Sequence, residues 1–136
     1  MSRTIAALPL FLLLAACGTS STSEPGLSGT VSLDPQLAAQ VSPGETVFLF
    51  ARLPEGPPMP LAIQRLEVRD LPYRFRLDDS HAMTEQGLSS VEHVVVVVRV
   101  SRSGRAMPAS GDLEGRSSAV PTGATDLRIV IDRVLP

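Results

Sequence analysis

The chain of 136 residues contains no lysine, no tryptophan and a single cysteine. All of its basic residues are arginines, and its formal net charge is -2. Nucleic-acid binding needs clustered positive charge and usually aromatic side chains for stacking, so this composition argues against it. With one cysteine, no disulfide can form within the chain, and the fold has to be held together by its apolar core.

Residues suited to catalysis are also scarce. Only two histidines, His81 and His93, are present, and no Gly-X-Ser-X-Gly motif accompanies them. Ser-His-Asp catalysis needs a histidine set between an acid and a nucleophile, so we expect no catalytic residues and no enzymatic activity. His93 precedes a valine run and is expected at a strand end. Asp78 and Asp79, followed by Ser80, predict a turn rather than a calcium site, because adjacent aspartates bond their own backbone amides.

The N-terminal residues have the pattern of an export signal. Arg3 precedes the apolar stretch 5–16, which is too short to span a bilayer. Residues 14–17 read Leu-Ala-Ala-Cys and resemble the lipobox of bacterial lipoproteins. This resemblance implies cleavage before Cys17 and acylation of that residue with diacylglycerol and palmitate. Because Gly18 rather than aspartate follows, it also implies sorting to the outer membrane, facing the periplasm.

Three segments follow from this pattern. Residues 1–16 are predicted to be a lipoprotein signal peptide. Residues 17–26 contain a run of serine, threonine and glycine that cannot bury apolar surface, so they are predicted to be a flexible tether. Residues 27–136 are predicted to form one small domain, long enough to bury roughly two thirds of its surface.

The predicted domain is all-β, because short apolar runs alternate with proline, glycine and aspartate clusters and no helical period is sustained. Asp34 and Pro35 predict one helical turn over 34–40. About seven strands predict an immunoglobulin-like antiparallel β-sandwich with that one short helical turn, although transthyretin-like and cupredoxin-like sandwiches fit the same pattern. The predicted strands are 27–33, 46–53, 61–68, 71–77, 92–103, 113–120 and 127–135.

Three strands carry more specific expectations. The strand at 46–53 is apolar on both faces as far as Phe50, which is typical of a central strand. The strand at 61–68 changes its apolar parity, which predicts a bulge near residues 64–65. The valine run 94–98 has to be covered on both faces, and three arginines are predicted to flank it as aggregation gatekeepers. These are Arg99, Arg102 and Arg105.

Residues 81–83 read His-Ala-Met and carry the clearest metal signal. Imidazole and thioether groups suit copper, and Met59 and Met107 are further thioethers in predicted loops. A copper site would need three or four such ligands to converge. The other interpretation is that the methionines fill gaps at the sheet edge. We expect no cofactor, and keep copper bound by His81 and Met83 as the alternative.

Most of the predicted domain resembles one known family. The run Gly-Thr-Val-Ser-Leu-Asp-Pro at 29–35 and nine further segments are similar, in order, to the C-terminal periplasmic domain of the CycH (CcmI) cytochrome c-type biogenesis proteins. That domain is similar to an immunoglobulin-like sandwich, as the strand pattern also predicts. The further segments are 43–52, 56–62, 70–72, 77–80, 82–83, 88–90, 99–104, 111–115 and 130–134.

The resemblance implies a non-enzymatic role, since CycH-type proteins hold apocytochrome c for the haem-ligation complex. We therefore expect a lipid-anchored periplasmic binding or assembly module, accessory to cytochrome c maturation, with apocytochrome c or haem-ligation components as partners. The alternatives are a copper-handling lipoprotein and a structural envelope lipoprotein. A partner surface is expected on the predicted loops, because loops commonly carry binding residues. Its candidate residues are Met59, Asp78, Asp79, His81, Met83 and Arg102.

Overall fold

The computed structural model describes residues 9, 26–56, 59–83, 85 and 87–136. The predicted signal peptide, apart from residue 9, and the tether up to residue 25 lie outside the described residues. Within them, regular structure consists of β-strands and four single-turn 3-10 helices, which confirms the all-β prediction. The 3-10 helices are η1 (Ala38–Gln40), η2 (Val68–Asp70), η3 (Asp79–His81) and η4 (Leu88–Ser90). The strands are β1 (Leu27–Leu33), β2 (Thr46–Arg52), β3 (Pro60–Glu67), β4 (Tyr73–Leu77), β5 (His93–Ser101), β6 (Leu113–Arg116), β7 (Val120–Pro121), β8 (Leu127–Ile131) and β9 (Arg133–Val134).

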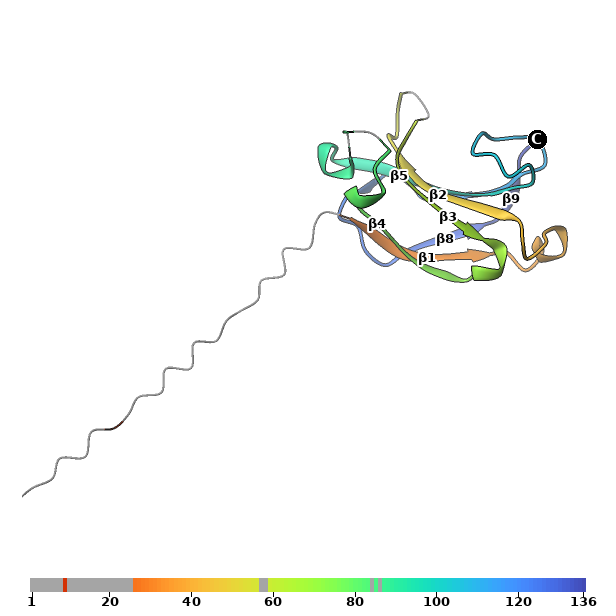
Figure 1. Cartoon of the computed structure of the whole chain (residues 1–136), viewed down its shortest axis with the longest axis horizontal. Helices are drawn as coiled ribbons and strands as arrows, with labels where there is room; N and C mark the ends of the chain where they lie inside the picture. The colour runs from red at the N-terminus through yellow and green to blue at the C-terminus, as the bar shows by residue number, and fades with distance from the viewer. Residues whose placement is uncertain (1–8, 10–25, 57–58, 84, 86) are drawn as a thin grey trace, which may run out of the picture.

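The strands form two layers, which Figure 1 shows one above the other. One is a three-stranded sheet in the order β4-β1-β8. The other has the order β3-β2-β5-β6-β9, with β7 also paired to β5. Every strand pairing among the described residues is antiparallel except that of β1 with β8, which is parallel. Strand β2 lies between β3 and β5, as its apolar faces predict.

The main apolar core lies between the two sheets, where alternate side chains of each strand point inward. Val94, Val96, Val98 and Val100 of β5 are fully buried there. On the other sheet, β4 turns Tyr73, Phe75 and Leu77 inward. Its two arginines, which lie between them in the sequence, point outward. In β4 this arrangement follows the alternation of apolar residues and arginines in its sequence. On the second face of the valine run, Val97 is buried and Val95 is half-buried, so the predicted cover is complete on the inner face and partial on the outer one.

Two predicted strands are each divided. The prediction of one strand over 127–135 is wrong, because β8 pairs with β1 whereas β9 pairs with β6 of the other sheet. The chain changes layers at Asp132, whose backbone amide donates to the carbonyl of Glu114 (3.3 Å). The predicted strand 113–120 becomes β6 and β7. Arg116 pairs with Val97 of β5, and Val120 pairs with Val94. The chain thus advances four residues between these pairs while β5 advances three, and the extra residue interrupts the hydrogen-bond ladder.

The bulge in β3 lies elsewhere than predicted. The register between β2 and β3 is regular through residues 64–65 and shifts only between Ala51 and Arg52, opposite the start of β3. The prediction at 64–65 is therefore wrong. Gln64 takes an inward position because its Nε2 donates to the Tyr73 hydroxyl (2.9 Å), while Ile63 is left on the outer face of the sheet.

Candidate functional site

The outer face of the larger sheet carries a second apolar cluster. Phe48 and Phe50 of β2 and Val97 of β5 are all below 10% exposed there, with Val95 and Ile63 packed against them. An outer face of a sandwich is normally polar, because it meets water. These side chains point away from the main core, so the sheet has apolar surface on both sides.

A groove of about 470 Å³ opens on this outer face. Phe50, Ile63 and Val97 contribute its apolar surface. Met83, after η3, and Met107, in the loop between β5 and β6, also line it and are 56% and 77% exposed. Apolar grooves of this size with a few placed polar groups are typical of ligand sites.

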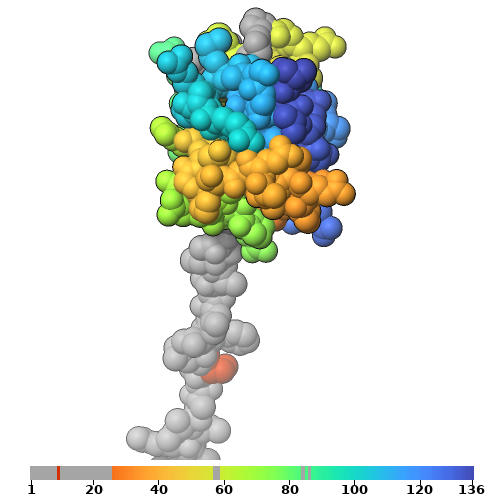
Figure 2. All heavy atoms as spheres, turned by 90° about the vertical axis from the view of Figure 1, so that its right-hand side faces the viewer, coloured from red at the N-terminus to blue at the C-terminus, as the bar shows by residue number. Residues whose placement is uncertain are grey.

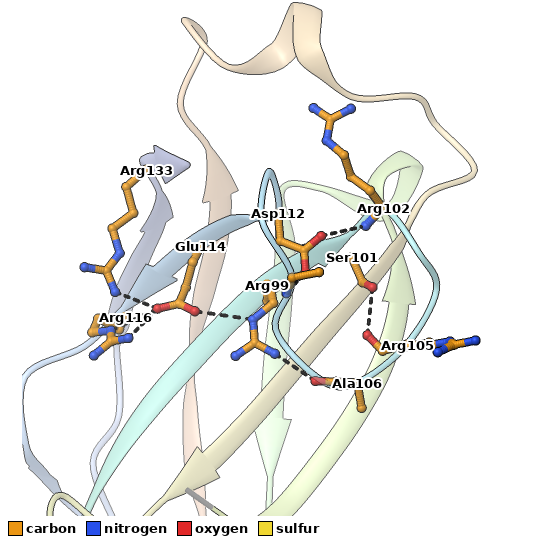
Figure 3. A network of polar contacts seen from close by, with 10 residues as sticks. Arg99, Ser101, Arg102, Arg105, Ala106, Asp112, Glu114, Arg116 and Arg133 are labelled. Atoms are coloured by element: carbon orange, nitrogen blue, oxygen red, sulfur yellow. Dashed lines mark hydrogen bonds and ion pairs between the residues drawn. The ribbon is translucent and has the colours of Figure 1, made fainter. Parts of the chain in front are cut away.

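The loop between β5 and β6 is held over this face by buried polar groups (Figure 3). Arg99 Nη1 donates to the carbonyl of Ala106 (2.8 Å), and the Ser101 hydroxyl donates to that of Arg105 (2.7 Å). The fully buried Asp112 accepts from the backbone amides of Arg102 and Ala109 at 3.0 and 2.9 Å. These bonds fix the loop that brings Met107 to the groove.

Glu114 forms the charged centre of the site and is 2% exposed. Its Oε1 accepts from Arg116 Nη2 (2.5 Å) and Arg133 Nη2 (2.6 Å), and its Oε2 accepts from Arg99 Nε (3.3 Å), as Figure 3 shows. Burial raises the pKa of Glu114, but the hydrogen bonds and charges of the surrounding arginines outweigh burial and hold that pKa below its ordinary value. Glu114 is therefore a carboxylate shared by three guanidinium groups.

Arg99 is the most buried of these cations. Its side chain is 7% exposed, and its guanidinium carbon lies 5.3 Å from the centroid of the Phe50 ring. At this distance the ring face attracts the cation. Arg99 was predicted to flank the valine run as a gatekeeper, and the structure places its side chain in the buried floor of the groove. Arg102 and Arg105 do remain exposed beyond the end of β5.

The predicted partner residues of the segment 78–83 lie beside the start of β3. The Met83 amide donates to the carbonyl of Leu61 (3.3 Å), and this contact brings Met83 to the groove. Met59 directly precedes β3, is exposed and is not among the residues that line the groove. The nearby His81 ring accepts at Nδ1 from the backbone amide of Asp78 (3.3 Å), so this nitrogen orients the ring within its own turn.

The two aspartates form the predicted turn. Asp78 Oδ1 accepts from the amide of Ser80 (2.9 Å), and Asp79 Oδ1 accepts from the amide of Ser89 (3.1 Å). The hydrogen bond from the Ser80 side chain lowers the pKa of Asp78, and that from Ser89 lowers the pKa of Asp79. Among the described residues no three His, Cys, Asp or Glu side chains are grouped to hold a metal ion.

Arg102 lies at the opposite end of β5 from the segment 78–83, so the structure does not bring all the predicted partner residues together. Its Nη2 donates to the carbonyl of Gln40 (2.6 Å) and its Nε to that of Gly111 (3.0 Å). Figure 2 looks onto this end, where the connection containing η1 (orange) lies below the loop after β5 (cyan to light blue) and the C-terminal residues (dark blue). Arg102 joins these connections.

The sequence-based search missed Phe50, Arg99 and Glu114 as site residues. Alternate residues of a strand share a face, so Arg99 lies on the same face of β5 as Val95 and Val97. This spacing could have indicated that Arg99 belongs to an apolar surface. Its partner Glu114 lies 15 positions along the chain, and only the pairing of β5 with β6 brings the two together.

No helix among the described residues is long and apolar enough to cross a membrane.

Comparisons with known proteins agree with the resemblance seen in the sequence. The family described as "Cytochrome c-type biogenesis protein H Ig-like domain" matches residues 27–132. The cytochrome c-type biogenesis protein CycH of Pseudomonas aeruginosa (strain PAO1) is 42% identical over 109 residues, which are 79% of this chain and 25% of that protein. An uncharacterized protein of Aquifex aeolicus (strain VF5) is 30% identical over 108 residues, 79% of this chain and 71% of that protein. The chain thus spans about a quarter of the Pseudomonas relative. No solved structure matches it significantly.

Proposed function

This chain belongs to the family of Ig-like domains of cytochrome c-type biogenesis protein H, and we propose on that premise that it is an accessory protein of cytochrome c maturation. In this proposal it binds a partner protein and catalyses no reaction. The partner is an apocytochrome c or a component of the haem-ligation machinery. The name of the Pseudomonas relative supports the process, and the groove on the outer sheet face supports binding as the mode of action.

The observation that carries this proposal is the apolar groove. Exposed large apolar side chains that gather on one surface mark interaction sites. Met83 and Met107 both line the groove, and flexible thioether side chains adapt to the shape of a partner. The loop bearing Met107 is held in place by part-buried hydrogen bonds from Arg99 and Ser101, so its backbone is ordered before any partner arrives. Preorganisation of this kind reduces the entropic cost of binding.

The proposal includes a membrane anchor. Cys17 would carry the lipid, and residues 17–26 would connect it to the first strand, with the domain on the periplasmic side of the outer membrane. Acyl chains bury methylene groups in the bilayer, and several chains together give stable anchoring. The sequence of residues 14–17 supports this part of the proposal.

Affinity capture of the lipidated full-length protein from its native envelope, after crosslinking, tests the function. We expect the capture to enrich an apocytochrome c or a haem-ligation component. The variant Met107→Glu should lose that enrichment, because it places a charge on the apolar wall of the groove. Met59→Glu is the matched control, since Met59 is similarly exposed but lies outside the groove. Capture that contains no cytochrome c maturation protein would refute the proposal.

A further inference from the structure

We propose that the groove recognises a segment of a partner polypeptide in which a carboxylate lies beside apolar side chains. This inference names the ligand chemistry of the proposed binding function and rests on that function. It follows from three properties of the groove: its excess of positive charge, the unused donors of its arginines, and the apolar surface around them.

The groove is positively charged. Arg52, Arg99 and Arg116 line it, and Glu114 is the one acidic side chain that does so among the described residues, which leaves a net charge of +2. Both Glu114 oxygens already accept hydrogen bonds from arginines. The local carboxylate is therefore more than neutralised, and a second carboxylate entering the groove meets attraction rather than repulsion.

Its arginines also retain donors for a ligand. A guanidinium has five N–H donors, and Arg99 uses one at Nε and one at Nη1 among the described residues. The side chain of Arg52 forms no hydrogen bond or ion pair with any other described residue, and Arg52 is only half-buried. Arginine binds carboxylates through paired, charge-assisted hydrogen bonds. Arg52, whose guanidinium donors are not engaged by any described residue, is the first candidate for such a pair.

Apolar surface surrounds these charges. Phe50, Ile63 and Val97 lie beside the arginines, and the two methionine side chains stand at its border. Neighbouring apolar groups exclude water, and charge interactions are stronger where water is excluded. A ligand that has only a carboxylate would leave this apolar surface exposed to water. A ligand that has only apolar groups would leave donors of the buried Arg99 without an acceptor. The complementary ligand has both features.

A binding assay with the full-length protein and fluorescently labelled, C-terminally amidated hexapeptides tests this inference. The probes are alternating leucine and aspartate, alternating leucine and asparagine, and alternating serine and aspartate. We expect the leucine–aspartate peptide to bind roughly tenfold more tightly than either of the others, because it alone offers a carboxylate to the arginines and leucine side chains to the apolar surface. A leucine–asparagine peptide with a free carboxyl terminus tests whether a terminal carboxylate serves equally well.

Arg52→Gln and Met107→Gln should each weaken binding of the leucine–aspartate peptide several-fold. Arg74→Gln is the matched control, because Arg74 is exposed on the outer face of the other sheet and the substitution removes the same charge. Thermal unfolding of each variant shows whether it is folded. Because Arg52 and Met107 lie on different elements, one variant still tests the groove if the other does not fold. The assay uses no maturation component, so it succeeds or fails separately from the capture experiment.

Three results would overturn the inference. The first is equal binding of the aspartate and asparagine peptides. The second is an equal loss of binding in Arg52→Gln and Arg74→Gln, which would show a general effect of net charge. The third is a failure of all the peptides to bind, together with evidence that the groove binds another ligand. That evidence would be binding of phosphatidylglycerol vesicles, or self-association of the protein, that Met107→Gln abolishes.

Discussion

Glu114 is the residue on which the charged part of the site depends. It is almost fully buried, and a buried carboxylate is costly unless hydrogen bonds and opposite charges compensate it. Arg99, Arg116 and Arg133 supply that compensation from β5, β6 and β9. One side chain thus joins three strands of the larger sheet and holds Arg99 in the groove.

Replacing this carboxylate leaves a buried cation without its partner. We expect Glu114→Gln to lower the free energy of unfolding by roughly 3 kcal/mol, the usual scale for breaking a buried pair by removing one member. Chemical denaturation followed by circular dichroism measures the change. The control is Glu92→Gln, because Glu92 is exposed and its side chain forms no ion pair with a described residue. Equal stability of the two variants would contradict the role given to Glu114.

The lowered pKa of Glu114 predicts an acid-sensitive contribution to stability. Since its folded pKa lies below the unfolded value of about 4.3, the contribution is fully present above that value and is lost as the pH falls through the folded pKa. The stability difference between the wild type and Glu114→Gln should therefore be constant from pH 7 to about pH 5 and shrink below about pH 4. Denaturation curves at several pH values measure it. A difference that grows on acidification would contradict this account.

At the scale of elements, local sequence was sufficient for the strands whose side chains strictly alternate. The alternation of β4 specifies both the strand and the face that is buried, whereas the β-branched run of β5 specifies the strand alone. It was insufficient where a strand ends for a long-range reason. The boundary between β8 and β9 exists because Asp132 lies where the chain passes from one sheet to the other, and no local pattern marks that point.

For the site too, some features could be predicted from local sequence and others depend on contacts between distant residues. The apolar outer face of β2 was visible in its sequence, because residues 47–51 have no polar side chain to turn outward. The position of Gln64 was not, since an inward glutamine is acceptable only through its bond to Tyr73 on another strand. The groove needs the pairing of β5 with β6 and the folded loop between them, and both are long-range facts.

The close approach of β6 to β8 gives a prediction for one glycine. A Cβ atom added at Gly115 would lie 2.1 Å from the carbonyl oxygen of Val130, a backbone atom that cannot move aside cheaply. Gly115→Ala should lower the free energy of unfolding by at least about 1–3 kcal/mol, the usual cost of overpacking. Urea denaturation measures this cost. Gly123→Ala is the control, since no described atom lies within 4 Å of the added Cβ, and equal stability of the two variants would argue against the close packing of these strands.

The whole molecule, as proposed, joins a lipid anchor at Cys17 to a binding domain. Cys17→Ser should abolish incorporation of labelled palmitate and release the protein from the membrane fraction, because serine has no thiol to form the thioether. Metabolic labelling followed by fractionation measures both effects. Ser21→Ala is the control within the proposed tether. Undiminished labelling and membrane association of Cys17→Ser would show that the protein is held by other means.

In this proposal, the groove on the larger sheet is the surface through which the domain meets a cytochrome c maturation partner. The most direct test of the proposal is photo-crosslinking in the native envelope, with a photoreactive amino acid at position 107 in the groove or at position 74 on the outer face of the other sheet. We expect a crosslink to an apocytochrome c or a haem-ligation component from position 107 and none from position 74. A crosslink to such a protein from position 74 alone, or from neither position, would contradict the proposal.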